Sequence, residues 1–130
     1  MKPSANFLEH TNLTVRDPKA LAQKLCTIFD WQIRWQGDAI NEGFTVHVGS
    51  ASSYLALYTP KRLIESNSRS DAHLNNLNHI GVVVESLDEI QAKLNELGLE
   101  TFSHRDYEPG QRFYVLVDDD LELEVISYAA

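Results

Sequence analysis

The chain has 130 residues, of which 43% are hydrophobic, and a formal net charge of -8. This length suits one compact domain or two very small modules, and the apolar content is enough to build a core. An acidic chain without a Lys/Arg cluster repels phosphates, which argues against nucleic acid and membrane surfaces as partners. No apolar run reaches the roughly 20 residues of a membrane span, and residues 1–6 lack a signal-peptide pattern, so we expect a cytoplasmic protein.

The first expected elements are a strand in "LEHTNLTV", which contains His10, and a helix that follows it. Asp17 and Pro18 are typical of a helix start, and apolar residues then recur at helical spacing. Three further strands are predicted in "WQIRWQ", "FTVHVGS" and "SYLALYT", because Gly, Asn and Ser residues separate these stretches. Residues of about 6–59 therefore read as one β-α-β-β-β module.

The second half of the chain repeats this pattern after a polar linker at about residues 60–75. His79 in "LNHIGVVV" follows His10 by 69 residues, and the same offset places Leu94 on Leu25. Ser86 supplies the second helix start, and "LETFSH", "RFYVLV" and "LELEVISY" predict three strands. Residues of about 76–128 form the second module of a single α+β domain, 1–130, in which two tandem modules make a curved sheet cup.

Strand alternation indicates which polar groups face this cup. His10 shares a face with Asn12 and Thr14, and Glu124 shares one with Glu122. A lone histidine in an apolar strand is usually a hydrogen-bonded core residue, but two at equivalent repeat positions favour a shared role. With Glu124 they give two nitrogens and one oxygen, a set that holds one divalent ion of iron, manganese, nickel or zinc and leaves positions open.

From "LEHTNLTV" through "LNHIGVVV" to "FYVLVDDDLELEV", the chain resembles the vicinal-oxygen-chelate superfamily. That superfamily includes glyoxalase I, extradiol dioxygenases, fosfomycin-modifying enzymes and bleomycin-resistance proteins. The resemblance implies that His10, His79 and Glu124 are metal ligands. Glyoxalase I enzymes carry a fourth ligand, usually glutamate, where "SYLALY" places Ala56. Because alanine cannot bind metal or move a proton, the three-ligand set favours dioxygenase-like or thiol-transferase-like chemistry over true glyoxalase I activity, with lyase chemistry left open.

Other side chains are expected to line the cavity. By alternation Tyr54, Ala56 and Tyr58 share a face, as do Arg112 and Tyr114. Tyr114 corresponds to a substrate-contacting tyrosine of the fosfomycin enzymes, so Tyr114 and His47 are the expected catalytic residues. Tyr54, Tyr58 and Arg112 are the expected substrate contacts, the last as a donor to an anionic group. Each has an alternative role in packing or at the surface.

Two further expectations concern a loop and the assembly. The loop "SHRDYEPGQ", with His104, Arg105, Asp106 and Tyr107, could close over the cup or be an ordinary charged hairpin. Single-chain members of this superfamily commonly build each cup from two subunits, so we expect a homodimer acting on a small-molecule substrate. The rival function is a metal-free small-molecule binding protein of the bleomycin-resistance type, and a scaffold with purely structural histidines is a third possibility.

Overall fold

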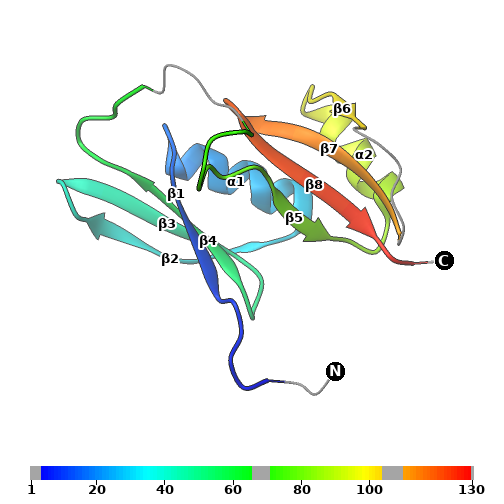
Figure 1. Cartoon of the computed structure of the whole chain (residues 1–130), viewed down its shortest axis with the longest axis horizontal. Coiled ribbons are helices and arrows are strands. Elements are labelled where there is room, and N and C mark those ends of the chain that lie inside the picture. Colours follow the sequence, from blue (N-terminus) through cyan, green and yellow to red (C-terminus); the bar gives the residue numbers. More distant parts are fainter. Residues whose placement is uncertain (1–3, 66–70, 104–109, 130) are drawn as a thin grey trace. The chain divides into compact units, whose positions relative to one another are not determined.

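The structure, a computed structural model, describes residues 4–65, 71–103 and 110–129. The chain divides into two compact units, Met1–Ile64 and Glu65–Ala130 (Figure 1). The described residues of each unit form one helix and four strands in the order β-α-β-β-β, which confirms the predicted α+β modules. The loop with His104, Arg105, Asp106 and Tyr107 lies outside the described residues.

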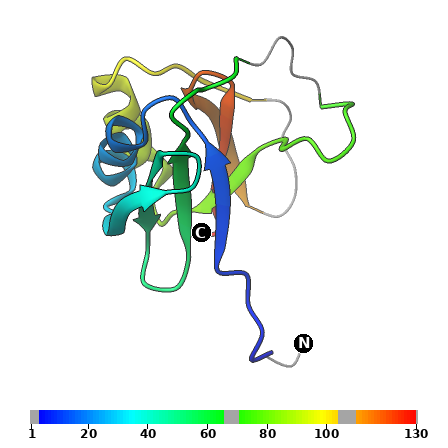
Figure 2. The same cartoon turned by 90° about the vertical axis from the view of Figure 1, so that its left-hand side faces the viewer.

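The first unit consists of β1 (His10–Thr14), α1 (Pro18–Phe29), β2 (Gln32–Ala39), β3 (Gly43–Gly49) and β4 (Tyr54–Thr59). Its sheet has the strand order β1-β4-β3-β2, with β1 parallel to β4 and the other pairs antiparallel. Helix α1 covers one face of this sheet (Figure 2). The side chains fully buried between helix and sheet include Leu25, Ile28, Val46, Val48 and Leu57.

The second unit consists of β5 (Ile80–Val83), α2 (Leu87–Glu96), β6 (Thr101–Phe102), β7 (Gln111–Asp118) and β8 (Leu121–Ser127). The strand order β5-β8-β7-β6, with β5 parallel to β8, repeats the topology of the first unit. Leu94, Val115, Leu123 and Val125 are fully buried and form its core. Two details differ from the expectation: β5 begins one residue after His79, and the described part of "LETFSH" forms a strand of only two residues.

The same local chemistry starts both helices. The Asp17 carboxylate accepts a hydrogen bond from the Ala20 N–H, and the Ser86 hydroxyl accepts one from the Glu89 N–H. These bonds satisfy backbone donors that have no partner within a helix. Ser86 follows Asp17 by the same 69 residues that separate the two histidines, so the repeat includes the caps. Among the described residues, the helices are too short and too polar for either to cross a membrane.

Candidate functional site

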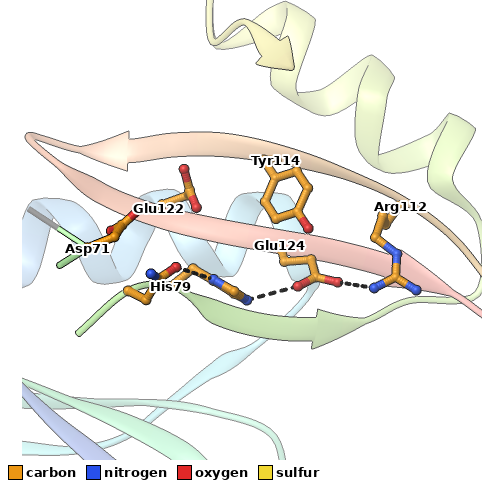
Figure 3. A pocket seen from close by; sticks show the side chains of 7 residues that line it. Asp71, His79, Arg112, Tyr114, Glu122 and Glu124 are labelled. Carbon is orange, nitrogen blue, oxygen red and sulfur yellow. Dashed lines mark hydrogen bonds and ion pairs between the residues drawn. The ribbon is translucent and has the colours of Figure 1, made fainter. Parts of the chain in front are cut away.

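A pocket of about 370 Å³ lies on the second unit, on the sheet face opposite the core (Figure 3). It is lined by charged and polar residues from the segment before β5 and from strands β7 and β8: Asp71, Asn78, His79, Arg112, Tyr114, Glu122 and Glu124. Alternation along β8 explains part of this lining, because Leu123 and Val125 point into the core while Glu122 and Glu124 point the other way. Four of the predicted site residues therefore share one pocket: His79, Arg112, Tyr114 and Glu124.

Glu124 is the centre of this pocket because both of its carboxylate oxygens are engaged. Its Oε2 atom lies 2.9 Å from Nε2 of His79, and its Oε1 atom accepts a hydrogen bond of 2.8 Å from Nη1 of Arg112 (Figure 3). The side chains of Glu124 and Arg112 are each only 13% exposed. Arg112 is thus a partly buried partner of Glu124, whereas the sequence left open whether it was a solvated strand residue or a donor to substrate.

His79 is held on both of its ring nitrogens. Nδ1 lies 2.8 Å from Oδ1 of Asn78, while Nε2 faces Glu124. The ring of Tyr114 stands edge-on to the imidazole at 5.9 Å between centroids. Tyr114 is directly opposite Glu124 in the β7–β8 pairing, is only 4% exposed, and directs its hydroxyl toward that carboxylate (Figure 3). These contacts fix the orientation of the imidazole and place a phenol beside it.

Two further carboxylates, Asp71 and Glu122, line the same pocket. Alternation predicts that Glu122 shares the face of Glu124, whereas Asp71 falls in the predicted linker and Asn78 has no predicted role. The pocket has three carboxylates against one guanidinium and one imidazole, so its charge favours a cation. The signal that could have found Asn78 is its position directly before a repeated histidine.

On the first unit, a row of aromatic rings crosses all four strands. His10 of β1 stacks on Tyr54 of β4 at 4.9 Å, Tyr54 stacks on His47 of β3 at 4.7 Å, and His47 contacts Trp35 of β2 at 5.2 Å, all measured between ring centroids. Strand pairing explains the two outer contacts, because His10 is opposite Tyr54 and Trp35 is opposite His47. Tyr54 and His47 are diagonal neighbours, since His47 is opposite Ala56. The predicted site residues His10, His47 and Tyr54 are therefore brought together.

Charged groups surround this row. A break in the β2–β3 register between Ile33 and Trp35 accompanies the placement of the Arg34 guanidinium 4.4 Å from the Tyr54 ring centroid. Glu9 accepts hydrogen bonds from Nδ1 of His10 at 2.9 Å and from the Tyr54 hydroxyl at 3.4 Å. The bond from His10 holds the pKa of the Glu9 carboxyl below its ordinary value. Partial burial, with His10 and Arg34 nearby, lowers the pKa of His47, so its neutral form is favoured.

The remaining predicted residues of the first unit have different surroundings. The Tyr58 hydroxyl donates to the carbonyl of Ile40 at 3.0 Å and accepts from Nδ2 of Asn41 at 3.1 Å, which ties it to the β2–β3 turn. Its role as a substrate contact stays a prediction. Ala56 is opposite both Asn12 and His47, as the predicted alternation requires. In the second unit Glu124 is opposite Gly81 and Tyr114, so Ala56 and Glu124 occupy equivalent positions.

No family model matches the sequence, and neither does any curated protein. Solved structures do match. A glyoxylase/bleomycin resistance protein/dioxygenase domain from Frankia sp. EAN1pec is 21% identical, with a TM-score of 0.77 over 95% of this chain and 98% of that chain. Fosfomycin resistance protein FosX from Listeria monocytogenes, in complex with Mn(II) and 1S,2S-dihydroxypropylphosphonic acid, is 20% identical, with a TM-score of 0.71 over 98% and 95%.

FosX from Mesorhizobium loti is also 20% identical, with a TM-score of 0.69 over 98% of this chain and 94% of that chain. Near-complete coverage in both directions matches the two β-α-β-β-β units described above. The chain has the vicinal-oxygen-chelate fold. This confirms the resemblance drawn from the repeat, and identities of about one fifth show the fold alone.

Within this vicinal-oxygen-chelate fold, the donor set of the second unit fits a divalent metal. Two ligand atoms that bind one ion at right angles, each about 2.1 Å from it, are about 3 Å apart. The 2.9 Å between Nε2 of His79 and Oε2 of Glu124 is compatible with that spacing. In residues 4–65, 71–103 and 110–129, no group of three or more His, Cys, Asp or Glu side chains is arranged to hold a metal. The second unit therefore supplies two candidate ligands, and His10, the expected third, belongs to the first unit.

Proposed function

We propose that the chain is a divalent-metal-dependent enzyme of the vicinal-oxygen-chelate type, with His10, His79 and Glu124 as the metal ligands. The observation that carries the proposal is the 2.9 Å approach of His79 Nε2 to Glu124 Oε2 in a pocket rich in carboxylates. The Mn(II) complex of FosX, which shares the fold, supports a metal in such a site. Iron, manganese, nickel and zinc all suit two imidazoles and one carboxylate.

A bound divalent ion would polarise adjacent oxygens of a small substrate and stabilise the negative charge that develops on them. The side chains of this chain then do the positioning. Arg112 holds Oε1 of Glu124, so Oε2, the oxygen that faces Nε2 of His79, would be the one to bind an ion together with that nitrogen. The Tyr114 hydroxyl, which points toward Glu124, would orient substrate or transfer a proton, and His47 is the corresponding candidate on the first unit.

The absence of a carboxylate at the position of Ala56 favours dioxygenase-like or thiol-transferase-like chemistry over glyoxalase I. Ala56 is the equivalent of Glu124 in strand pairing, so the first unit offers no carboxylate there. Turnover of a catechol, of fosfomycin with and without glutathione, and of the methylglyoxal hemithioacetal separates these reactions. We expect the last substrate to be the poorest.

Metal content tests the proposal directly. We expect about one Mn²⁺ or Zn²⁺ per wild-type chain by elemental analysis after dialysis, and loss of that metal in His79→Ala and Glu124→Gln. Glu122→Gln is the matched control, because Glu122 lies on the same strand face and lines the same pocket. Equal metal content in all four proteins would refute the metal function.

One observation favours a second function, a metal-free binding protein for small molecules. His79, Glu124 and Arg112 satisfy one another without any ion, since each carboxylate oxygen already has a cationic partner when His79 is protonated. In that case the wild type contains no metal, and the polar side chains of the pocket would bind a small molecule directly.

We further propose that the chain is a homodimer, as single-chain proteins with two such modules commonly are. In the described part of the chain, β1 and β2 are the outer strands of one sheet and β5 and β6 are those of the other, and outer strands are where a second subunit commonly pairs. Light scattering at micromolar concentration should give twice the chain mass of 14.7 kDa. A monomer would contradict this proposal without affecting the metal test.

A further inference from the structure

We propose that Glu9 and Asn78 are paired positioning residues, each of which fixes the histidine that follows it so that its Nε2 atom is the ligand nitrogen. The inference rests on the proposed metal function and adds two residues to it. Glu9 precedes His10, Asn78 precedes His79, and the two pairs are separated by the same 69 residues. The repeat therefore carries the orienting residue as well as the ligand.

In the first unit, the Glu9 carboxylate can only accept hydrogen bonds when ionised. Its Oε1 atom lies 2.9 Å from Nδ1 of His10, so Nδ1 carries the proton and donates. The Tyr54 hydroxyl donates to the same oxygen at 3.4 Å, and the Tyr54 ring stacks on the imidazole with only 17° between the planes. These contacts fix both the tautomer and the ring plane of His10, and they leave Nε2 as the lone-pair nitrogen.

In the second unit, an amide replaces the carboxylate but makes the same contact. Oδ1 of Asn78 lies 2.8 Å from Nδ1 of His79, and an amide oxygen is an acceptor only. Nδ1 of His79 therefore donates, and its Nε2 atom is the one that faces Glu124 at 2.9 Å. Two acceptors of different charge, at equivalent positions, thus contact the same ring nitrogen, which leaves Nε2 of His79 as the nitrogen that binds an ion once it carries no proton.

This arrangement matters because a histidine that binds metal must present a nitrogen without a proton. An acceptor on the other nitrogen holds the correct tautomer before metal arrives and strengthens the ligand, and loss of such an acceptor typically lowers metal affinity about 10–100-fold. The carboxylate of Glu9 donates more electron density than the amide of Asn78, so Glu9 should have the larger effect of the two.

Two measurements on the full chain test the inference. The first is a long-range ¹H–¹⁵N spectrum of histidine-labelled protein, which shows which ring nitrogen carries the proton. Metal-free protein at about pH 9, where a free imidazole is neutral, reports on His10, and Zn²⁺-loaded protein reports on both histidines. His10→Gln and His79→Gln assign the signals. The second is Zn²⁺ affinity by chelator competition for Glu9→Leu, Glu9→Gln, Asn78→Leu and Asn78→Asp, with Asn76→Leu as control. Asn76 lies on the same segment, but its amide nitrogen donates to the Leu77 carbonyl, whereas the Asn78 oxygen accepts from His79.

We expect the proton on Nδ1 of both histidines in wild type, and its partial transfer to Nε2 in metal-free Glu9→Leu. The leucine variants should bind Zn²⁺ about 10–100-fold more weakly, while Glu9→Gln, Asn78→Asp and Asn76→Leu stay within about threefold. Wild-type affinity in both leucine variants, or a proton on Nε2 of His10 in the metal-free wild type, would overturn the inference. A wild type that shows the Nδ1 proton on His10 but takes up no metal would instead refute the proposed function.

Discussion

The two units share a scaffold but differ in the groups on the sheet face opposite the core. In the first, His10 stacks in a row of rings with Tyr54, and Ala56 occupies the central position of β4. In the second, His79 faces Glu124, which occupies the equivalent position of β8 and is paired with Arg112. The repeat therefore preserves the helix caps, the core leucines and the hydrogen-bonded histidines, whereas only the second unit has a carboxylate at the central position of its last strand.

This difference shows how a duplicated module can carry unlike groups on equivalent sheet faces. A carboxylate at both central positions would put a negative charge on each of the two equivalent faces. In the first unit the central residue is the uncharged Ala56, and the rings of that unit contact one another. The second unit can keep a partly buried carboxylate because Arg112 accompanies it from the neighbouring strand. We therefore expect equal effects on stability when the shared core or caps are changed in either unit, and unequal effects when residues on the sheet faces opposite the core are changed.

The largest expected effect is in the shared core. Leu25 and Leu94 are repeat equivalents, and both are 0% exposed. Truncation of either to alanine should lower the free energy of unfolding by about 3 kcal/mol, because buried methyl groups are lost and a cavity remains. Urea unfolding measures this, with Lys24→Ala and Lys93→Ala as controls expected within about 0.5 kcal/mol of wild type. A loss in only one of the two leucine variants would break the equivalence of the cores.

The next largest effect should come from Glu124→Ala. This change gives the second unit the alanine that the first unit has at the equivalent position, Ala56. The change removes the carboxylate from Arg112, whose side chain is only 13% exposed, and we expect a loss of about 3 kcal/mol in stability. Glu124→Gln should lose less, since its amide oxygen can still accept. The control is Glu42→Ala, whose partner Lys61 is 64% exposed, with an expected loss below about 1 kcal/mol. Equal losses for the alanine variants would show that the Arg112 pair is not special.

The helix caps should give smaller and nearly equal effects. Asp17→Ala and Ser86→Ala each remove a hydrogen bond to a first-turn N–H and should cost about 1 kcal/mol. The loss for Asp17→Ala should be slightly larger, because its charge also interacts with the helix dipole and α1 has no acidic residue in its first turn. Thermal unfolding of these variants, with Asp17→Ser and Ser86→Asp as cap-preserving controls, checks this. An unchanged Tm in either alanine variant would show that its cap contributes nothing to stability.

The repeat and its polar and apolar alternation were enough to predict both modules, the helix caps and the faces of His10, Ala56 and Glu124. They were not enough to predict which side chains touch across strands. Alternation places Arg112 and Glu124 on faces, but their contact depends on the β7–β8 register, which the sequence does not state. Arg34 illustrates the same limit, because a register shift in β2 accompanies its approach to Tyr54, a contact that strict alternation does not predict.

The smallest predicted effect is a pH dependence confined to the first unit. His47 is opposite Ala56, while the equivalent residue opposite Glu124 is a tyrosine, Tyr114. Because the pKa of His47 is lowered in the folded state by partial burial and by His10 and Arg34, the unfolded chain binds its proton first as the pH falls. The contribution of His47 to the free energy of unfolding is therefore fully present above the ordinary histidine pKa of about 6.5. It is lost as the pH falls from that value to the lower pKa of the folded state.

The variant His47→Tyr, which gives the first unit the residue of the second, should reduce the loss of stability between about pH 7 and pH 5, as measured by urea unfolding across that range. Glu9 also has a lowered pKa, so its contribution is lost only as the pH falls through a window below the ordinary glutamate value of about 4.3, which keeps the two effects apart. His73→Gln, an exposed histidine outside the row of rings, is the control and should leave the profile unchanged. If His47→Tyr and wild type lose the same stability on acidification, the imidazole in the row does not favour its neutral form, and the first unit has no acid sensitivity of its own at this position.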